Sequence, residues 1–243
     1  EERGTVFVGR EEPLAAIAGY LAGNDESSQS GAPLLVHGPG GVGKSALLAR
    51  AWLQALPEPP DTVRMVRFIG ATPGSVDVRF LLETLCRELA RAYGQDETLP
   101  EGGLKKLIET FSERLGFASA DRPLWLLIDA VDQLVEHGGE APYGWLPQRL
   151  PPAVRLVVSV LDGPAGAAVQ QRLPEAVPLS VLPVAEREAE AMLDARLTTA
   201  TPTQPPRRLT PDQRRMVLAG LRGSGLPLWL TVAITVARRW RSY

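Results

Sequence analysis

The stretch Gly38-Pro39-Gly40-Gly41-Val42-Gly43-Lys44-Ser45 decides the fold of this 243-residue chain, because it has the spacing G-x-x-x-x-G-K-S. An apolar run over 33–37 precedes it, and a helical pattern over 46–56 follows it. A strand, a glycine-rich loop and a helix in that order form the setting that a phosphate-binding loop requires. The glycines allow backbone N–H groups to converge on phosphate oxygens at the positive end of the helix. The stretch therefore predicts a site for a nucleoside triphosphate, with a ligand-free glycine turn as the weaker alternative.

The side chains of this loop have separate predicted roles toward ATP and Mg²⁺. Lys44 is expected to reach the β- and γ-phosphates, and Ser45 to supply a hydroxyl ligand to Mg²⁺. The chain contains no Asn-Lys-x-Asp segment of the kind that reads guanine, which favours adenine. The residues expected to line the bound nucleotide, ATP or ADP, are Pro39, Gly40, Gly41, Val42, Gly43, Lys44, Ser45 and Ala46.

A phosphate loop needs a second metal-ordering acid on a neighbouring strand. The apolar run over 124–129 ends in Asp129, which would place a carboxylate at the carboxyl edge of the sheet as a Mg²⁺ ligand. Asp132 follows three residues later, and two roles stay open for it. It would either polarise the attacking water or act as the N-cap of a helix through Gln133 and Leu134.

Strand and helix patterns alternate along most of the chain, which predicts an α/β fold with three layers. Continuous apolar strands indicate a parallel sheet that helices cover on both faces. Helical patterns alone follow residue 185, so we expect a nucleotide-binding domain over 1–184 and a small helical domain over 185–243. The expected strands are 33–37, 63–69, 124–129, 154–160 and 176–181, and the expected helices are 12–21, 46–56, 80–93, 104–115, 186–197, 211–221 and 227–240.

Composition excludes several other classes of protein. Lys and Arg number 26 against 28 Asp and Glu, so the net charge of −2 makes a nucleic-acid or anionic-membrane partner unlikely. No apolar run reaches the ~18 residues that would span a bilayer. Cys86 is the single cysteine, which rules out an intramolecular disulfide and favours a reducing compartment such as the cytoplasm. His37 and His137 show no metal-ligand spacing and are expected to be structural or surface residues.

Four segments resemble a known family of ATPases. Val8-Gly9-Arg10-Glu11 is similar to the entry segment of AAA+-related and STAND-class ATPases. Asp129-Ala130-Val131-Asp132-Gln133 resembles the NACHT form of the Walker B segment. The segment 145–160 is similar to nephrocystin-like and telomerase-protein-component-like NACHT proteins, and Gly225-Leu226-Pro227-Leu228 resembles the G-x-P turn of STAND helical domains. Together they cover about residues 6–240 and identify a NACHT-like member of the STAND class.

This resemblance implies further site residues. Val8, Gly9 and Arg10 would lie against the adenine or the ribose, and Pro227 would close over the base from the helical domain. Ser159, at the end of the fourth strand, would occupy the sensor position near the γ-phosphate.

The chain also departs from the family pattern at the positions that support hydrolysis. Many relatives carry an arginine at or just after the position of Ser159, where this chain continues with Val160, Leu161 and Asp162. Ala130 stands where AAA+ proteins have a catalytic glutamate, and Gln133 stands where a second acid is usual. Binding is compatible with these departures, whereas the hydrolysis that Lys44, Asp129 and Asp132 would support is expected to be slow.

The predicted function is that of a nucleotide-dependent conformational and oligomerisation switch. Closure of two domains over a nucleotide converts occupancy by the γ-phosphate into a change of shape. The resemblance implies self-association on activation, with effector and sensor modules outside this chain, in a larger signalling or defence protein. Two alternatives stay open: a turnover enzyme such as a P-loop kinase, and an AAA+-like motor or loader that acts on DNA.

Overall fold

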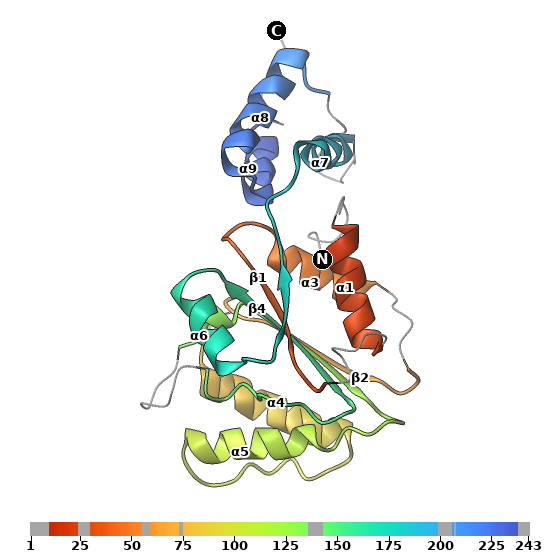
Figure 1. The fold of residues 1–243 in the computed structure, drawn as a ribbon, viewed down its shortest axis with the longest axis vertical. Helices are drawn as coiled ribbons and strands as arrows, with labels where there is room; N and C mark the ends of the chain where they lie inside the picture. The colour runs from red at the N-terminus through yellow and green to blue at the C-terminus, as the bar shows by residue number, and fades with distance from the viewer. Residues whose placement is uncertain are drawn as a thin grey trace.

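A computed structural model describes residues 10–23, 30–54, 59–72, 75–135, 143–198, 206 and 208–237, with only the backbone for 222–224. Figure 1 shows an α/β body, with a separate group of helices at one end of it. No described helix combines the length and the apolar character that would let it cross a membrane.

The body is built on five parallel strands in the order β2-β3-β4-β1-β5. All five apolar runs singled out in the sequence are strands of this sheet, so the prediction of a parallel sheet is confirmed. β1 lies between β4 and β5, which places the loop after β1 inside the carboxyl edge of the sheet. The strands are β1 (Leu34–Gly38), β2 (Val63–Phe68), β3 (Leu124–Asp129), β4 (Val154–Leu161) and β5 (Val177–Ser180).

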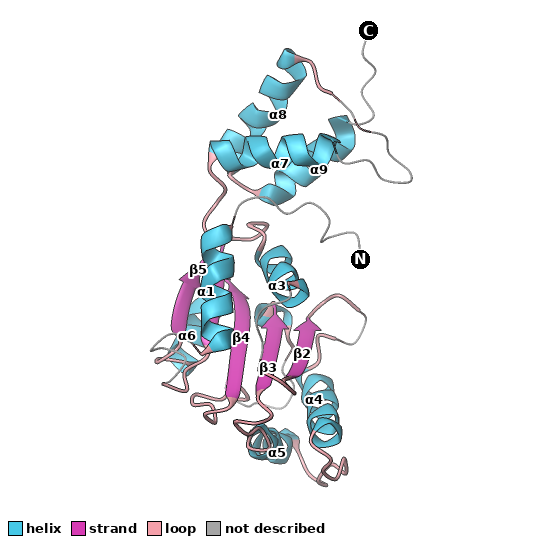
Figure 2. Cartoon of the chain, turned by 90° about the vertical axis from the view of Figure 1, so that its right-hand side faces the viewer, coloured by secondary structure: helices cyan, strands magenta, loops and turns pink. Residues whose placement is uncertain are grey.

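Helices cover both faces of the sheet, as Figure 2 shows. Along β3, Leu124, Leu126 and Ile128 pack into a cluster with side chains of α4 (Val78–Ala92), α5 (Leu104–Leu115) and α6 (Pro164–Arg172). The alternate residues Trp125 and Leu127 pack into a second cluster with α1 (Glu11–Ala22) and α3 (Lys44–Leu53). Alternate side chains of one strand thus enter two separate cores, which explains why the strand is apolar throughout. The expected three-layer α/β architecture is confirmed.

One helix of the body has no counterpart among the predicted elements. α6 begins at Pro164, a favoured residue at the first helical position, and follows Gly163. Its sequence is rich in small residues, and Val169 is its buried hydrophobic residue. An apolar stripe at helical spacing is therefore absent from this segment, and it is the stripe that identifies a helix in a sequence.

The three helices beyond the sheet have a hydrophobic cluster of their own. These helices are α7 (Glu186–Thr198), α8 (Pro211–Ser224) and α9 (Pro227–Ala237). Their cluster includes Leu193, Leu218 and Leu230, and it is distinct from both clusters of the body. The three helices expected after residue 185 are found, and residues 238–240 of the last one lie outside the described residues. The helix expected over 46–56 ends earlier, at Leu53, where Gln54 is extended, and its residues 55–56 also lie outside the described residues. A separate cluster supports the division of the chain at about residue 185, which stays a prediction.

Candidate nucleotide-binding site

The glycine-rich loop leaves the end of β1 and leads directly into α3. A side chain on Gly38 would place its Cβ 2.5 Å from the carbonyl oxygen of Val181, so only glycine fits there. Val42 is buried in the cluster that α1 and α3 share, and it anchors the middle of the loop. Gly40 and Ser45 are exposed, and Ser45 lies with Ala46 in the first turn of α3. The loop is thus fixed on one side and open to solvent on the other.

The Lys44 side chain folds back over the start of the loop. Its Nζ donates hydrogen bonds to the carbonyl oxygens of Gly38, at 2.7 Å, and Pro39, at 3.1 Å. Partial burial lowers the pKa of Lys44, and the negative charges of Asp132, Asp162 and Asp129 counteract that effect. The ammonium group therefore lies at the loop among three carboxylates, in the region where Lys44 was expected to meet phosphate.

Asp129, the expected metal-ordering acid, ends β3 and is 4% exposed. The hydroxyl of the fully buried Ser159 donates a 2.5 Å hydrogen bond to Asp129 Oδ1 and accepts one of 2.8 Å from the Ala130 N–H. In this structure Ser159 thus orients the Asp129 carboxylate, a contact that sequence reasoning missed. Its predicted role at the γ-phosphate stays a prediction.

The donor set at this edge suits Mg²⁺ bound together with phosphates. Ser45 offers a hydroxyl and Asp129 a carboxylate, which are the hard oxygen ligands that this ion prefers. The described residues contain no group of three or more His, Cys, Asp or Glu side chains that would hold a metal without further ligands. Mg²⁺ is usually held by one or two protein oxygens together with substrate phosphates and water, so the residues present fit this ion.

Asp132 lies in a short 3₁₀ helix, η2 (Val131–Gln133), directly after β3. The residue at the N-cap is Ala130, with φ of 59°, so the prediction that Asp132 caps a helix is wrong. The Asp132 carboxylate instead accepts a 3.0 Å hydrogen bond from the Leu161 N–H at the end of β4. It is half-buried there, and its proposed action on water stays a prediction.

Asp162 is a further residue of this edge that sequence reasoning did not select. Its N–H donates to the Gly38 carbonyl at 3.2 Å, and its carboxylate lies 3.0 Å from Nδ1 of His37. His37 is the last residue before Gly38, so this pair braces the point where the loop begins. The sequence did contain a signal for this residue, because Asp162 is an acid directly after β4, the strand beside β1. His37 has a structural role, as expected, and His137 lies outside the described residues.

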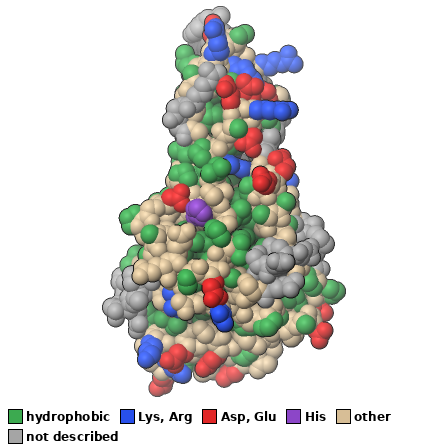
Figure 3. Space-filling model, viewed as in Figure 1, with side chains coloured by type: hydrophobic (Ala, Val, Ile, Leu, Met, Phe, Trp, Pro, Cys, Tyr) green, Lys and Arg blue, Asp and Glu red, His purple; other side chains and the backbone are tan. Residues whose placement is uncertain are grey.

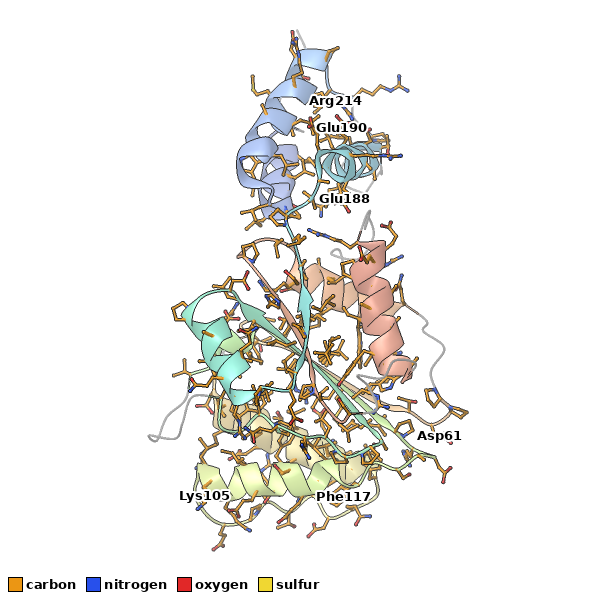
Figure 4. The ribbon with its side chains drawn as sticks, viewed as in Figure 1. Asp61, Lys105, Phe117, Glu188, Glu190 and Arg214 are labelled. Atoms are coloured by element: carbon orange, nitrogen blue, oxygen red, sulfur yellow. The ribbon has the colours of Figure 1, made fainter. Side chains whose placement is uncertain are left out.

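Arg10 also meets the loop, while Val8 and Gly9 lie outside the described residues. Arg10 is the N-cap of α1, and its Nη2 donates a 3.2 Å hydrogen bond to the Val42 carbonyl. Burial lowers the pKa of Arg10, and Glu188 of α7 counteracts this. Figure 4 shows Glu188 on the side of α7 that faces α1. The hydroxyl of buried Tyr20 donates to the Ala32 carbonyl at 2.8 Å, just before β1, and accepts the Leu156 N–H of β4 at 3.3 Å, which holds α1 on the sheet.

The turn before α9 brings Pro227 close to the phosphate loop. α8 ends at Gly225 in the left-handed conformation, and α9 begins at Pro227, as the predicted G-x-P turn requires. The ring of Pro227 lies 3.9 Å from the position that a Cβ on Gly43 would take. The neighbouring Leu228, which was not among the predicted site residues, donates its N–H to the Gly41 carbonyl at 3.3 Å. Parts of the chain that are far apart in sequence thus meet at the loop.

Comparison with known proteins agrees with this geometry. The sequence profile of the AAA ATPase domain family matches residues 6–160. The human NACHT domain- and WD repeat-containing protein 1 is 32% identical over 98% of this chain, which spans 15% of that protein's length. Telomerase protein component 1 of Rattus norvegicus is 32% identical over 86% of this chain, which spans 8% of its length.

A solved structure with a similar fold is the Aeropyrum pernix ORC1 protein in complex with DNA. Its TM-score is 0.63 at 18% identity, with 98% of this chain and 60% of that chain covered. At that identity the likeness concerns the fold alone. The profile match and the two relatives, together with the loop and the strand-end acid, establish that this chain belongs to the AAA ATPase domain family and confirm its resemblance to NACHT proteins.

Proposed function

We propose that this chain is the nucleotide-operated switch of a larger protein, which binds ATP or ADP and hydrolyses ATP slowly. One observation carries the proposal: Arg10 from the start of α1 and Leu228 from the start of α9 both donate hydrogen bonds to carbonyls of the phosphate loop. Occupancy of the loop and the position of the helices are then physically connected. A ligand that binds two such arrangements with different affinities shifts the population between them.

Binding is assigned to the residues at the carboxyl edge of the sheet. Lys44 would leave the carbonyls of Gly38 and Pro39 to meet phosphate oxygens, and the loop's backbone N–H groups would complete the contact. Ser45 and Asp129 would hold Mg²⁺, which when bound offsets the charge of the phosphates. Ser159 keeps the Asp129 carboxylate in place through their 2.5 Å hydrogen bond.

We infer slow hydrolysis from the contacts that the candidate catalytic side chains make. A general base must reach the attacking water within hydrogen-bond distance. The Asp132 carboxylate already accepts the Leu161 N–H, and Ala130 has no group that could take its place. Leu161 ends β4 and Asp162 follows it, at the place where an arginine would stabilise developing negative charge. These features favour retention of ATP over rapid turnover.

The rest of the proposal concerns the protein as a whole. The human relative is named for its WD repeats as well as for its NACHT domain, and this chain spans 15% of its length. We therefore place sensor and effector modules outside this chain, with self-association on activation as the output and the cytoplasm as the compartment.

Replacement of Lys44 by alanine tests the binding site. We expect the Lys44→Ala variant to bind ADP and ATP at least about 100-fold more weakly, because two charge-assisted hydrogen bonds to phosphate contribute roughly 1.5–3 kcal/mol each. Isothermal titration calorimetry measures this, with circular dichroism as the check on folding. The exposed Lys105 on α5 provides the control, since Lys105→Ala should bind like the parent chain. Unchanged ATP affinity in Lys44→Ala would refute the assignment of the site.

The metal site is tested by titrating Mg²⁺ against bound ATP. Asp129→Ala should abolish the dependence of ATP affinity on Mg²⁺. Ser159→Ala keeps the carboxylate but removes its hydroxyl donor, so the Mg²⁺ midpoint should rise roughly three- to tenfold. Affinity measured without Mg²⁺ should be unaltered in Ser159→Ala and should not fall in Asp129→Ala, which removes a negative charge from beside the phosphates. If Asp129→Ala retained its Mg²⁺ dependence, another acid would have to hold the metal.

Steady-state hydrolysis distinguishes the switch from a turnover enzyme such as a P-loop kinase. We expect kcat below the ordinary enzyme range of ~1–10³ s⁻¹, because Ala130 stands at the position of the AAA+ catalytic glutamate and Asp132 is held on the Leu161 N–H. A coupled assay of phosphate release with the purified chain and saturating Mg²⁺–ATP gives this rate. A kcat within that range, without any partner, would contradict the switch.

Loading onto DNA is a second candidate function, because a solved structure with a similar fold is a complex with DNA. The net charge of −2 argues against a basic groove on this chain. We expect no binding of a labelled duplex by fluorescence anisotropy near physiological ionic strength. Binding that weakens steeply as salt is added would instead support the DNA-loading function.

A further inference from the structure

The turn that opens α9 rests directly on the phosphate loop. Leu226 packs against the body cluster that contains Val42. Leu228 donates its N–H to the Gly41 carbonyl at 3.3 Å, and its own Cβ lies 3.2 Å from the position that a Cβ on Gly41 would take. Gly41 has φ of +76°, a conformation that strongly favours glycine. The glycine therefore serves the loop conformation and also leaves the space that Leu228 occupies.

The hydrogen bond to Gly41 has a consequence for the direction of the loop's N–H groups. In a planar trans peptide the carbonyl of one residue and the N–H of the next point in opposite directions. Leu228 holds the Gly41 carbonyl outward, so the Val42 N–H faces the loop, where it donates to the Pro39 carbonyl at 3.4 Å. The contact with Leu228 thus stabilises the internal turn of the phosphate loop.

The carbonyl of the next peptide is held by a second donor from outside the loop, the Arg10 side chain. Arg10 binds the Val42 carbonyl, so the N–H of Gly43 points away from Arg10. Two successive peptides of the loop are therefore fixed by donors from outside it, one from α9 and one from the start of α1. Because phosphate affinity depends on convergent N–H groups, both donors influence it without touching phosphate.

Leu228 contributes little to the packing of the helices themselves. Its side chain is 58% exposed and does not belong to the cluster that holds α7, α8 and α9 together. That cluster takes Leu230 and Ile234 from the opposite face of α9. In Figure 3, hydrophobic side chains gather where the helices meet the body. Loss of the Leu228 side chain should therefore alter the contact with the loop and leave the helical core intact.

We propose that Leu228 is a positioning residue for phosphate binding. The shape of the phosphate loop then depends on the position of α9 against it. By reciprocity, phosphate bound in the loop then stabilises the contact between α9 and the loop by the same free energy. This second half rests on the proposed switch function, whereas the effect on phosphate affinity does not.

The test compares Leu228→Ala with Val232→Ala in the full 243-residue chain. Val232 lies one turn further along the same face of α9 and is 57% exposed, which makes it a matched control. Affinities for ADP and for inorganic pyrophosphate are measured by displacement of a fluorescent nucleotide. Pyrophosphate reports on the loop alone, because it has no base or ribose.

Leu228→Ala keeps the N–H that donates to the Gly41 carbonyl but removes the side-chain packing beside that glycine. We expect the lost packing to weaken both ligands equally, by roughly three- to tenfold, and Val232→Ala to change neither. Equal affinities for Leu228→Ala and Val232→Ala would overturn the proposal. So would a loss for ADP with pyrophosphate unchanged, since Leu228 would then act on the base side of the site.

A second measurement separates this proposal from the switch. Cysteines introduced at the exposed positions Lys105 and Met216 carry a fluorescent pair across the body and the helices. The native Cys86 is buried, and burial raises its pKa to about 11, so it does not compete for the labels. Transfer efficiency that ADP, ATP and pyrophosphate leave unchanged would overturn the switch and the reciprocal half of the proposal. The affinity comparison would still decide the role of Leu228 in positioning the loop.

Discussion

The site depends first on the parallel pairing of β1 with β4 on one side and β5 on the other. Strands that run in one direction bring their carboxyl ends to one edge, and here Val36 pairs with Ser159 and Gly38 with Leu161. A slip of one residue in such a sheet turns every side chain to the opposite face. Between β3 and β4 such a slip would carry Ser159 away from Asp129. The register therefore determines the functional contacts as well as the core.

Hydrogen bonds at this edge fix the acids around Lys44. Asp129 accepts from the Ser159 hydroxyl, Asp132 from the Leu161 N–H, and Asp162 lies against His37. Groups held in this way need little reorganisation when a charged ligand arrives, which is the main advantage of a folded site over water. The same partners reduce the freedom of these carboxylates to act as bases. Under the proposed function, one set of contacts would thus favour binding and disfavour turnover.

Local sequence was sufficient for the sheet, the phosphate loop and the G-x-P turn, because each is encoded in a few neighbouring residues. α6 escaped prediction because Val169 alone is too little to define an apolar stripe. Of the two roles left open for Asp132, the helix cap was wrong, because its carboxylate accepts from the Leu161 N–H on an adjacent strand. Leu228 and Asp162 were missed for a related reason: their partners, Gly41 and His37, are more than 100 positions away in the sequence, where no local pattern reaches.

The free energy of the contacts between the body and the helices determines whether a bound nucleotide can change them. The helices have a hydrophobic cluster of their own, which is separate from the two clusters of the body. Across the junction lie the Leu228 N–H bond to Gly41, the packing of Leu226 and the attraction between Arg10 and Glu188. A hydrogen bond contributes about 0.5–1.5 kcal/mol, whereas micromolar binding of a ligand corresponds to roughly 8 kcal/mol. A small fraction of the binding free energy of a ligand would therefore be enough to change how α9 is held against the loop. The hydrogen bond between Leu228 and Gly41 is the contact through which this change would occur.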